Sequence, residues 1–195
     1  MVPMNRLIVS VGLLAMIWTN GCDENDADPQ TFPAEPTSDM LAAGPGGGSE
    51  FFMWSDSGRA RAAAANFQAA LWVTNEDTTH VEIEDMVGLF VYPGCLGSHP
   101  ALECDIVVKD ATYSQLEYGP SGMVFADSVG VWLDSTVIDW PADTYAADAA
   151  YYFYNPATGG FEELDTWVNP DNGWIECKVL HFSRYIIGRR LARSN

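Results

Sequence analysis

The chain has 195 residues, and its 9 basic and 27 acidic residues give a formal net charge of −18. A surface this negative repels nucleic acid and anionic lipid headgroups, which excludes both as primary partners. Apolar residues make up 48% and charged residues 18%, which is enough apolar material for the core of one domain and is not typical of a disordered chain.

The first 21 residues have the organisation of an export signal. Arg6 gives a positive start, and residues 7–18 form an apolar run that is too short, at about 18 Å as a helix, to cross a membrane. The run ends before Cys22 in a sequence that resembles a bacterial lipoprotein signal, with Thr19 where an aliphatic residue is usual. The resemblance implies that Cys22 carries a lipid and anchors the protein to a membrane. The alternative is an ordinary secretory signal with Cys22 as an incidental thiol, and both alternatives place the mature protein outside the cytoplasm.

Residues 22–50 are acidic and contain no lysine or arginine. Prolines and three consecutive glycines oppose regular structure in this stretch. It has too little apolar surface to offset the entropy that ordering would cost. We therefore expect a flexible tether that holds a domain at residues 51–195 clear of the membrane.

Short segments of β-type sequence follow one another from Phe67 to Ile187, with alternation of apolar and polar residues at period two. Arg59–Ala65 is expected to form one or two helical turns before them. Residues 155–160 and 169–173 carry the turn signals of hairpin loops. With about eight or nine strands and no long amphipathic helix, the sequence predicts an all-β fold, an antiparallel β-sandwich.

Three cysteines lie within the predicted domain. Cys95 and Cys104 bracket a short loop between two β-rich runs, so an oxidising compartment favours a disulfide between them, worth about 2–3 kcal/mol. Two reduced thiols are the alternative. A zinc site is disfavoured because His99, the nearest further ligand, lies too close to both cysteines. Cys177 is then an odd thiol, expected to be buried in a strand.

Two segments resemble a known family. Residues 118–125, YGPSGMVF, resemble the GPSG signature of the ZU-five domain, which is named for zonula occludens and the Unc-five netrin receptors. Residues 151–164 and the later HFSRY of residues 181–185 resemble the C-terminal half of related bacterial envelope proteins. The resemblance covers residues 66–188 and implies a β-sandwich that serves as an interaction or structural module. Without the family, GPSG is explained as a tight turn before a strand.

The tripeptide His181-Phe182-Ser183 is the one candidate catalytic site. In relatives that join a ZU-five module to a second sheet module, a similar HFS cleaves itself between Phe and Ser. The Ser183 hydroxyl would attack the Phe182 carbonyl, with His181 accepting the proton, and the resulting ester would be hydrolysed. The structural alternative, which we favour, is that Phe182 anchors the last strand. Apolar residues change parity after Val179, which predicts a bulge that turns Leu180 and Phe182 inward.

Two further candidate sites are weaker. Four acidic residues in a loop-like stretch offer hard oxygen ligands for calcium: Asp134, Asp139, Asp143 and Asp148. Four tryptophans offer a platform on which sugars stack: Trp132, Trp140, Trp167 and Trp174. Solvated acids and core or cross-strand aromatics are the simpler explanations.

We therefore expect an exported, lipid-anchored β-sandwich on the bacterial cell envelope, at its periplasmic or extracellular face. Its partners would be the membrane, through the lipid on Cys22, and an unidentified envelope or extracellular protein. No cofactor, metal or nucleic acid is expected, and the chain is not expected to be an enzyme. Cleavage at Phe182-Ser183 and binding of calcium or glycan remain the alternatives.

Overall fold

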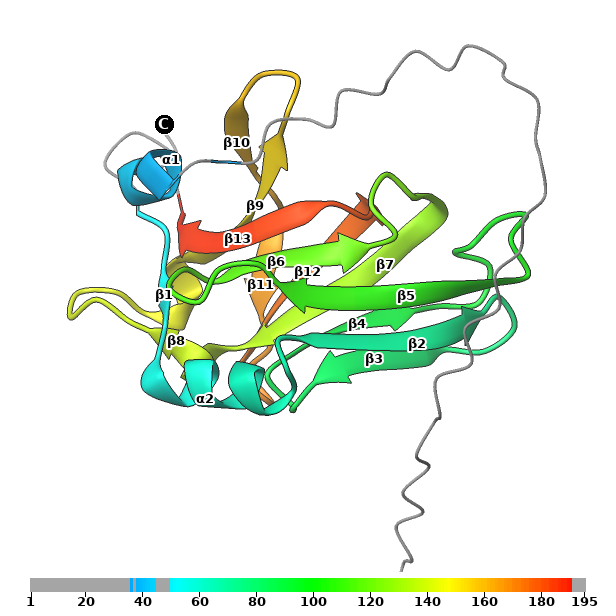
Figure 1. Cartoon of the computed structure of the whole chain (residues 1–195), viewed down its shortest axis with the longest axis horizontal. Coiled ribbons are helices and arrows are strands. Elements are labelled where there is room, and N and C mark those ends of the chain that lie inside the picture. The colour runs from blue at the N-terminus through cyan, green and yellow to red at the C-terminus, as the bar shows by residue number, and fades with distance from the viewer. Residues whose placement is uncertain (1–35, 37, 45–49, 191–195) are drawn as a thin grey trace, which may run out of the picture. The chain divides into compact units, whose positions relative to one another are not determined.

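The computed structural model describes residues 36, 38–44 and 50–190 (Figure 1). The predicted export signal at residues 1–21, the predicted lipidation site Cys22 and most of the predicted tether lie outside the described residues. No helix within the described residues is long and apolar enough to cross a membrane.

Part of the predicted tether is ordered, which corrects the expectation of a uniformly flexible segment. Ser38–Ala43 forms the short helix α1. Leu41 of this helix is buried in a small apolar cluster with Phe51, Tyr152 and Ile186. The cluster covers one part of the domain surface, and its burial of aromatic area explains why these few residues acquire structure.

The first strand and the second helix lead into the sandwich. The strand β1 (Met53–Trp54) pairs with β8 (Ile138–Asp139) in a two-stranded sheet. The helix α2 (Asp56–Ala64) begins at Ser55, whose hydroxyl accepts the Gly58 N–H at 3.2 Å. This confirms the helical turns expected from Arg59, although the helix starts three residues earlier.

The larger of the two main sheets has six antiparallel strands (Figure 1). Its strands, in spatial order, are β10 (Gly160–Glu163), β9 (Ala149–Asn155), β13 (Arg184–Arg189), β6 (Gln115–Gly119), β5 (Ala101–Val108) and β2 (Gln68–Thr74). The last strand in sequence, β13, therefore lies inside this sheet, between β9 and β6.

The second main sheet has five antiparallel strands. In spatial order they are β11 (Thr166–Val168), β12 (Trp174–His181), β7 (Val124–Asp134), β4 (Val87–Val91) and β3 (Thr79–Ile83). Two short 3₁₀ helices, η1 (Ser135–Val137) and η2 (Ala146–Asp148), complete the described elements. Both predicted hairpins are present, as β9–β10 and β11–β12.

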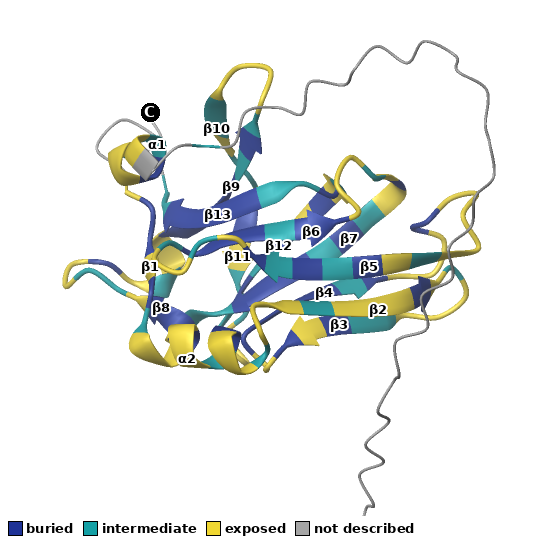
Figure 2. Ribbon diagram, viewed as in Figure 1, coloured by how far each residue is buried: buried dark blue, intermediate teal, exposed yellow. Residues whose placement is uncertain are grey.

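The two sheets enclose one apolar core, so the predicted antiparallel β-sandwich is confirmed (Figure 2). Inward-facing side chains of β4, β7 and β12 meet those of β5, β6 and β13, and most are fully buried. Figure 2 shows the contrast with β2 and α2, which are largely exposed. The strand β7, at 11 residues, runs without a break from Val124 to Asp134.

Candidate functional site

The strand β12 has an irregularity at its end, where the sequence predicted a bulge. Its register with β7 shifts between Val179 and His181, and Phe182 then turns fully into the core. Leu180 was expected to point inward with Phe182, but 60% of its surface is exposed. The register shift explains the exposure of Leu180, because it leaves this side chain on the outer face and returns the side chain of Phe182 to the core.

The GPSG turn meets this irregularity directly. The Gly119-Pro120 peptide bond is cis, and Gly122 has a positive φ of 82°, which L side chains rarely adopt. The Gly122 N–H donates to the carbonyl oxygen of Phe182 at 3.0 Å, and the Phe182 N–H donates to the Met123 oxygen at 2.8 Å. The two segments that resemble the ZU-five family are therefore joined through the backbone of Phe182.

Phe182 packs among other aromatic rings. Its ring lies edge-on to Phe125, with centroids 4.6 Å apart, and stacks on Tyr118 at 6.3 Å. The side chain has no solvent-exposed surface. Aromatic burial of this kind is one of the larger single contributions to the stability of a domain.

His181 and Ser183 lie on either side of Phe182 but do not form a hydrogen-bonded pair. The His181 ring lies edge-on to Phe153 at 4.8 Å, and the Tyr185 hydroxyl donates to the His181 carbonyl oxygen at 2.6 Å. Among the described residues, no hydrogen bond joins the Ser183 hydroxyl to the His181 ring, whose Nδ1 lies 3.5 Å from the Tyr185 hydroxyl. The imidazole is therefore held by aromatic neighbours rather than aligned as a base for Ser183.

The segment after Ser183 is fixed by a partly buried ion pair. Arg184 donates to the Glu117 carboxylate at 2.9 Å, and Lys109 lies 3.4 Å from the same carboxylate. Burial alone would raise the pKa of Glu117, but Arg184 and Lys109 outweigh it and lower the pKa. The pair thus connects β13 to β6 by charge as well as by backbone pairing.

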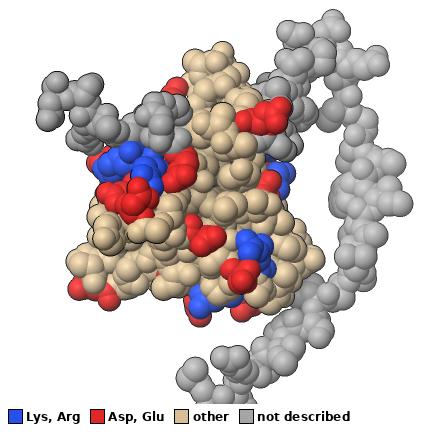
Figure 3. Space-filling model, turned by 90° about the vertical axis from the view of Figure 1, so that its left-hand side faces the viewer, with Lys and Arg blue, Asp and Glu red and all other residues tan. Residues whose placement is uncertain are grey.

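The other end of β13 is fixed by a second group of charges. Arg189 pairs with Asp143 at 2.9 Å and with Glu50 at 3.1 Å, and it also donates to Thr144. These contacts lower the pKa of Asp143, chiefly through the hydrogen bond from Arg189. On the face drawn in Figure 3, Lys and Arg atoms lie beside Asp and Glu atoms, as such pairs require.

The predicted disulfide is not formed. Cys95, Cys104 and Cys177 are free and buried in the structure. The Cys95 thiol lies 3.3 Å from the carbonyl oxygen of Ser128, whereas Cys104 faces the core from the middle of β5. Their spacing in sequence suggested proximity, but Cys95 lies in the loop that follows β4, whereas Cys104 lies in β5, which belongs to the other main sheet. Burial raises the pKa of both Cys104 and Cys177 to about 12, so each is a packing residue rather than a reactive thiol.

Three of the four acidic residues considered for calcium have other contacts. Asp134 accepts the Thr136 N–H at the start of η1, Asp143 pairs with Arg189, and Asp148 accepts the Tyr145 N–H. Within the part of the chain that the structure describes, no group of three or more potential ligands is placed to hold a metal ion. These side chains fix loops, and the structure does not bring them together.

The four tryptophans do not form one platform. Trp132 and Trp174 stack face to face at 3.9 Å on the outer side of the five-stranded sheet, but Trp132 is buried. Trp132 also donates its indole N–H to His80 at 3.1 Å. Trp140 packs edge-on to Phe52 within the main core instead. The stacked pair fills space left by Gly88, where an added Cβ would lie 2.6 Å from the Trp132 ring.

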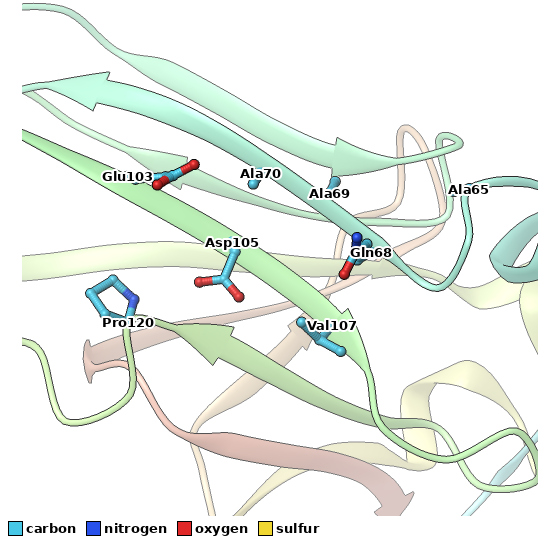
Figure 4. A pocket seen from close by; sticks show the side chains of 8 residues that line it. All are labelled: Ala65, Gln68, Ala69, Ala70, Glu103, Asp105, Val107 and Pro120. Atoms are coloured by element: carbon cyan, nitrogen blue, oxygen red, sulfur yellow. The ribbon is translucent and has the colours of Figure 1, made fainter. Parts of the chain in front are cut away.

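A hollow of about 530 Å³ lies on the outer side of the six-stranded sheet (Figure 4). Ala70, Gln68, Val107 and Pro120 are among the residues that line it, together with the carboxylate of Asp105. Burial raises the pKa of Asp105, and the neighbouring carboxylates of β5 and β6 raise it further. Sequence reasoning missed this hollow, because its lining residues carry no motif.

The resemblance to known families rests on the quoted residues alone. In comparisons with known proteins, no protein-family model and no curated protein sequence matches this chain. The likeness of GPSG and HFSRY to the ZU-five family therefore stays a prediction, whereas the β-sandwich stands on the structure itself.

Proposed function

We propose that this chain is a non-enzymatic β-sandwich module, exported and anchored by a lipid on Cys22, with a structural or protein-interaction role on the bacterial cell envelope. The proposal rests on the sequence of the export signal and on the way the fold uses its one candidate catalytic tripeptide. The proposal includes no cofactor.

The observation that carries the non-enzymatic role is the fixation of the Phe182-Ser183 bond. Phe182 is wholly buried, and its N–H and carbonyl oxygen bond to Met123 and Gly122. The Ser183 carbonyl oxygen accepts the Tyr118 N–H at 3.0 Å. These three hydrogen bonds satisfy backbone groups at the junction where the chain crosses from one sheet to the other.

The anchor is tested by replacing its proposed attachment atom. Cys22→Ser should abolish incorporation of labelled fatty acid and release the protein from washed membranes. The matched control is Cys177→Ser, which leaves the proposed anchor intact. Membrane retention and labelling that survive Cys22→Ser would refute the anchor.

A second candidate function is self-processing at Phe182-Ser183, and one contact favours it. The Gly122 N–H already donates to the Phe182 carbonyl oxygen at 3.0 Å, where negative charge would develop during attack. The Ser183 hydroxyl oxygen would bond to the Phe182 carbonyl carbon, the amide C–N bond would break, and the released nitrogen would take the proton. Water would then hydrolyse the ester, restoring the Ser183 hydroxyl and leaving a carboxylate on Phe182.

Cleavage at this bond would not release the C-terminal piece. The strand β13 is paired on both sides, with β9 and with β6, so a cut chain would stay associated. Intact mass under denaturing conditions distinguishes the two functions, with Ser183→Ala as the uncleavable control. A full-length mass for the wild type supports the module without self-processing, and two fragments that disappear in Ser183→Ala support the second candidate.

A further inference from the structure

The strand β2 has one unused hydrogen-bonding side. It ends the six-stranded sheet and pairs with β5 alone among the described strands. The Val108 N–H donates to the carbonyl oxygen of Phe67, and the Asn75 N–H donates to that of Pro100. Because bonded and non-bonded pairs alternate along an antiparallel ladder, the odd-numbered residues of β2 direct their backbone groups to β5. The residues that direct theirs to the open edge are Gln68, Ala70, Trp72 and Thr74, and of these the Gln68 N–H already donates to the carbonyl oxygen of Ala65 at 3.3 Å.

This edge lacks the usual protection against pairing with another chain. Residues 67–75 contain no charged residue and no proline, in a protein of net charge −18. Natural edge strands are protected by charges, prolines, bulges or short length. The other described edges of the two main sheets have such features, since β3 and β10 carry glutamates and β11 has three residues. The seven residues of β2 pair without a register shift.

Large apolar side chains are exposed on both sides of β2. Trp72, on the outer side, exposes 65% of its surface. Leu71 lies opposite the buried Cys104 on the inner side, yet 46% of it is exposed. The sandwich therefore leaves a core-facing leucine uncovered at this edge, and Figure 2 shows most of β2 as exposed.

We propose that β2 pairs antiparallel with β2 of a second copy of this chain, about a two-fold axis at Leu71, and so joins the two six-stranded sheets. Ala70 then lies opposite Trp72 of the other copy, and Gln68 lies opposite Thr74. Ala70, Trp72 and Thr74 direct both backbone groups to the open edge, and Gln68 offers its carbonyl oxygen there. If the register shifted by one residue, the free backbone groups of one copy would lie opposite residues of the other copy whose backbone groups already bond to β5. If it shifted by two residues, fewer residues of the two β2 strands would pair.

Shape supports the second copy as the occupant. In this register Trp72 of the partner lies opposite Ala70, a small residue that lines the hollow of about 530 Å³ (Figure 4). Opposite residues of an antiparallel pair have Cβ atoms about 5 Å apart, so the indole reaches the hollow. The Asp105 carboxylate there offers an acceptor for the indole N–H, which tryptophan requires when it is buried.

Charge supports the antiparallel direction. Arg59 and Arg61 precede β2, where they pair with Asp56 and Asp134 of the same chain. Glu76 and Asp77 follow β2. When two β2 strands pair antiparallel, the basic residues before one strand approach the acidic residues after the other, at both ends of the pair. The paired residues themselves carry no charge. Self-association names one partner for the proposed interaction module, and it does not depend on the lipid anchor.

A cysteine placed on the two-fold axis tests the register directly. The background is the full chain with Cys22→Ser, in which Cys95, Cys104 and Cys177 are buried. Residues 71 of the two copies would form a non-hydrogen-bonded pair with Cα atoms about 4.5 Å apart, which a disulfide spans. Leu71→Cys should therefore give a covalent dimer on mild oxidation. Thr74→Cys is the control, because its two copies would lie about 20 Å apart.

Solution mass provides a second measurement that needs no cysteine. The wild type should sediment as a concentration-dependent dimer, and Leu71→Lys should be a folded monomer because it places a charge at the axis. Trp72→Ala should raise the dissociation constant about tenfold or more. The matched control is Trp167→Ala, whose side chain is 41% exposed on the other sheet and should leave the constant unchanged. A wild-type monomer at all concentrations, or equal cross-linking by Leu71→Cys and Thr74→Cys, would overturn the proposal.

Discussion

The strands β13 and β2 belong to the same sheet but lie in opposite environments. β13 is paired on both sides, and four of its six residues are buried, whereas β2 is paired on one side and buries only Val73. The HFSRY motif leads into the first strand, and no motif marks the second. The comparison teaches that a recognisable motif can mark a highly constrained part of the backbone. The free binding capacity of a sheet can lie in a strand that has no motif and no charged residue.

The largest expected difference between the two regions is in stability. Phe182→Ala should lower the free energy of unfolding by about 3–5 kcal/mol, because it leaves a cavity among buried aromatic rings. Trp72→Ala should change it by less than about 0.5 kcal/mol in the monomer, because that side chain is mostly exposed. Urea unfolding at low protein concentration measures both. A loss for Phe182→Ala no larger than that for Trp72→Ala would remove the contrast.

Local sequence patterns predicted those parts of the fold that depend on local interactions. The hairpin loops at 155–160 and 169–173 were identified from turn residues, and both are present. The irregularity after Val179 was identified from a change of apolar parity, and the register does shift there. The direction of Leu180 was wrong, because parity alone does not say which residue a bulge leaves outside.

Local sequence patterns did not predict the features that depend on contacts between distant parts of the chain. Cys95 and Cys104 are close in sequence, but the chain passes from one sheet to the other between β4 and β5, and no local pattern reveals that crossing. Leu71 alternates as an inward residue and does face inward, yet the opposite sheet fails to cover it. The edge site at Trp72 had one available signal, the absence of charge from residue 67 to residue 75 in a strongly acidic chain.

The next effect concerns the turn that holds the Phe182 carbonyl. Gly122→Ala should cost about 1–2 kcal/mol, because an L side chain is strained at the positive φ of 82°. The matched control is Ser121→Ala in the same turn, which should change stability by less than about 0.5 kcal/mol. Urea unfolding compares the two, and equal stability of both variants would mean that the turn does not constrain β13.

A smaller effect should depend on pH. Because the pKa of Glu117 is lowered in the folded state, its ion pair with Arg184 stabilises the fold above the ordinary pKa of 4.5 and loses this effect as the pH falls through the lowered value. Glu117→Gln should cost about 1 kcal/mol at neutral pH and progressively less in acid. Glu76→Gln, an exposed loop residue, is the control. A cost for Glu117→Gln that grows in acid would contradict the assignment.

The smallest expected effect is an absence of reaction at the buried thiols. In the folded Cys22→Ser chain, Cys95, Cys104 and Cys177 should react negligibly with a thiol reagent at pH 8, because burial raises the pKa of each. All three should react after unfolding in urea without reductant. Reaction of one thiol alone would show that the other two form a disulfide. Leu71→Cys adds an exposed thiol at the β2 edge and should react at once when freshly reduced.

The most direct test of the whole account is the intact mass of the protein taken from native membranes under denaturing conditions. The account predicts one species that begins with a lipid-modified Cys22 and continues uncut through the Phe182-Ser183 bond. An unmodified N-terminus would contradict the anchor, and a chain that ends at Phe182 would contradict the non-enzymatic role of the β12–β13 junction.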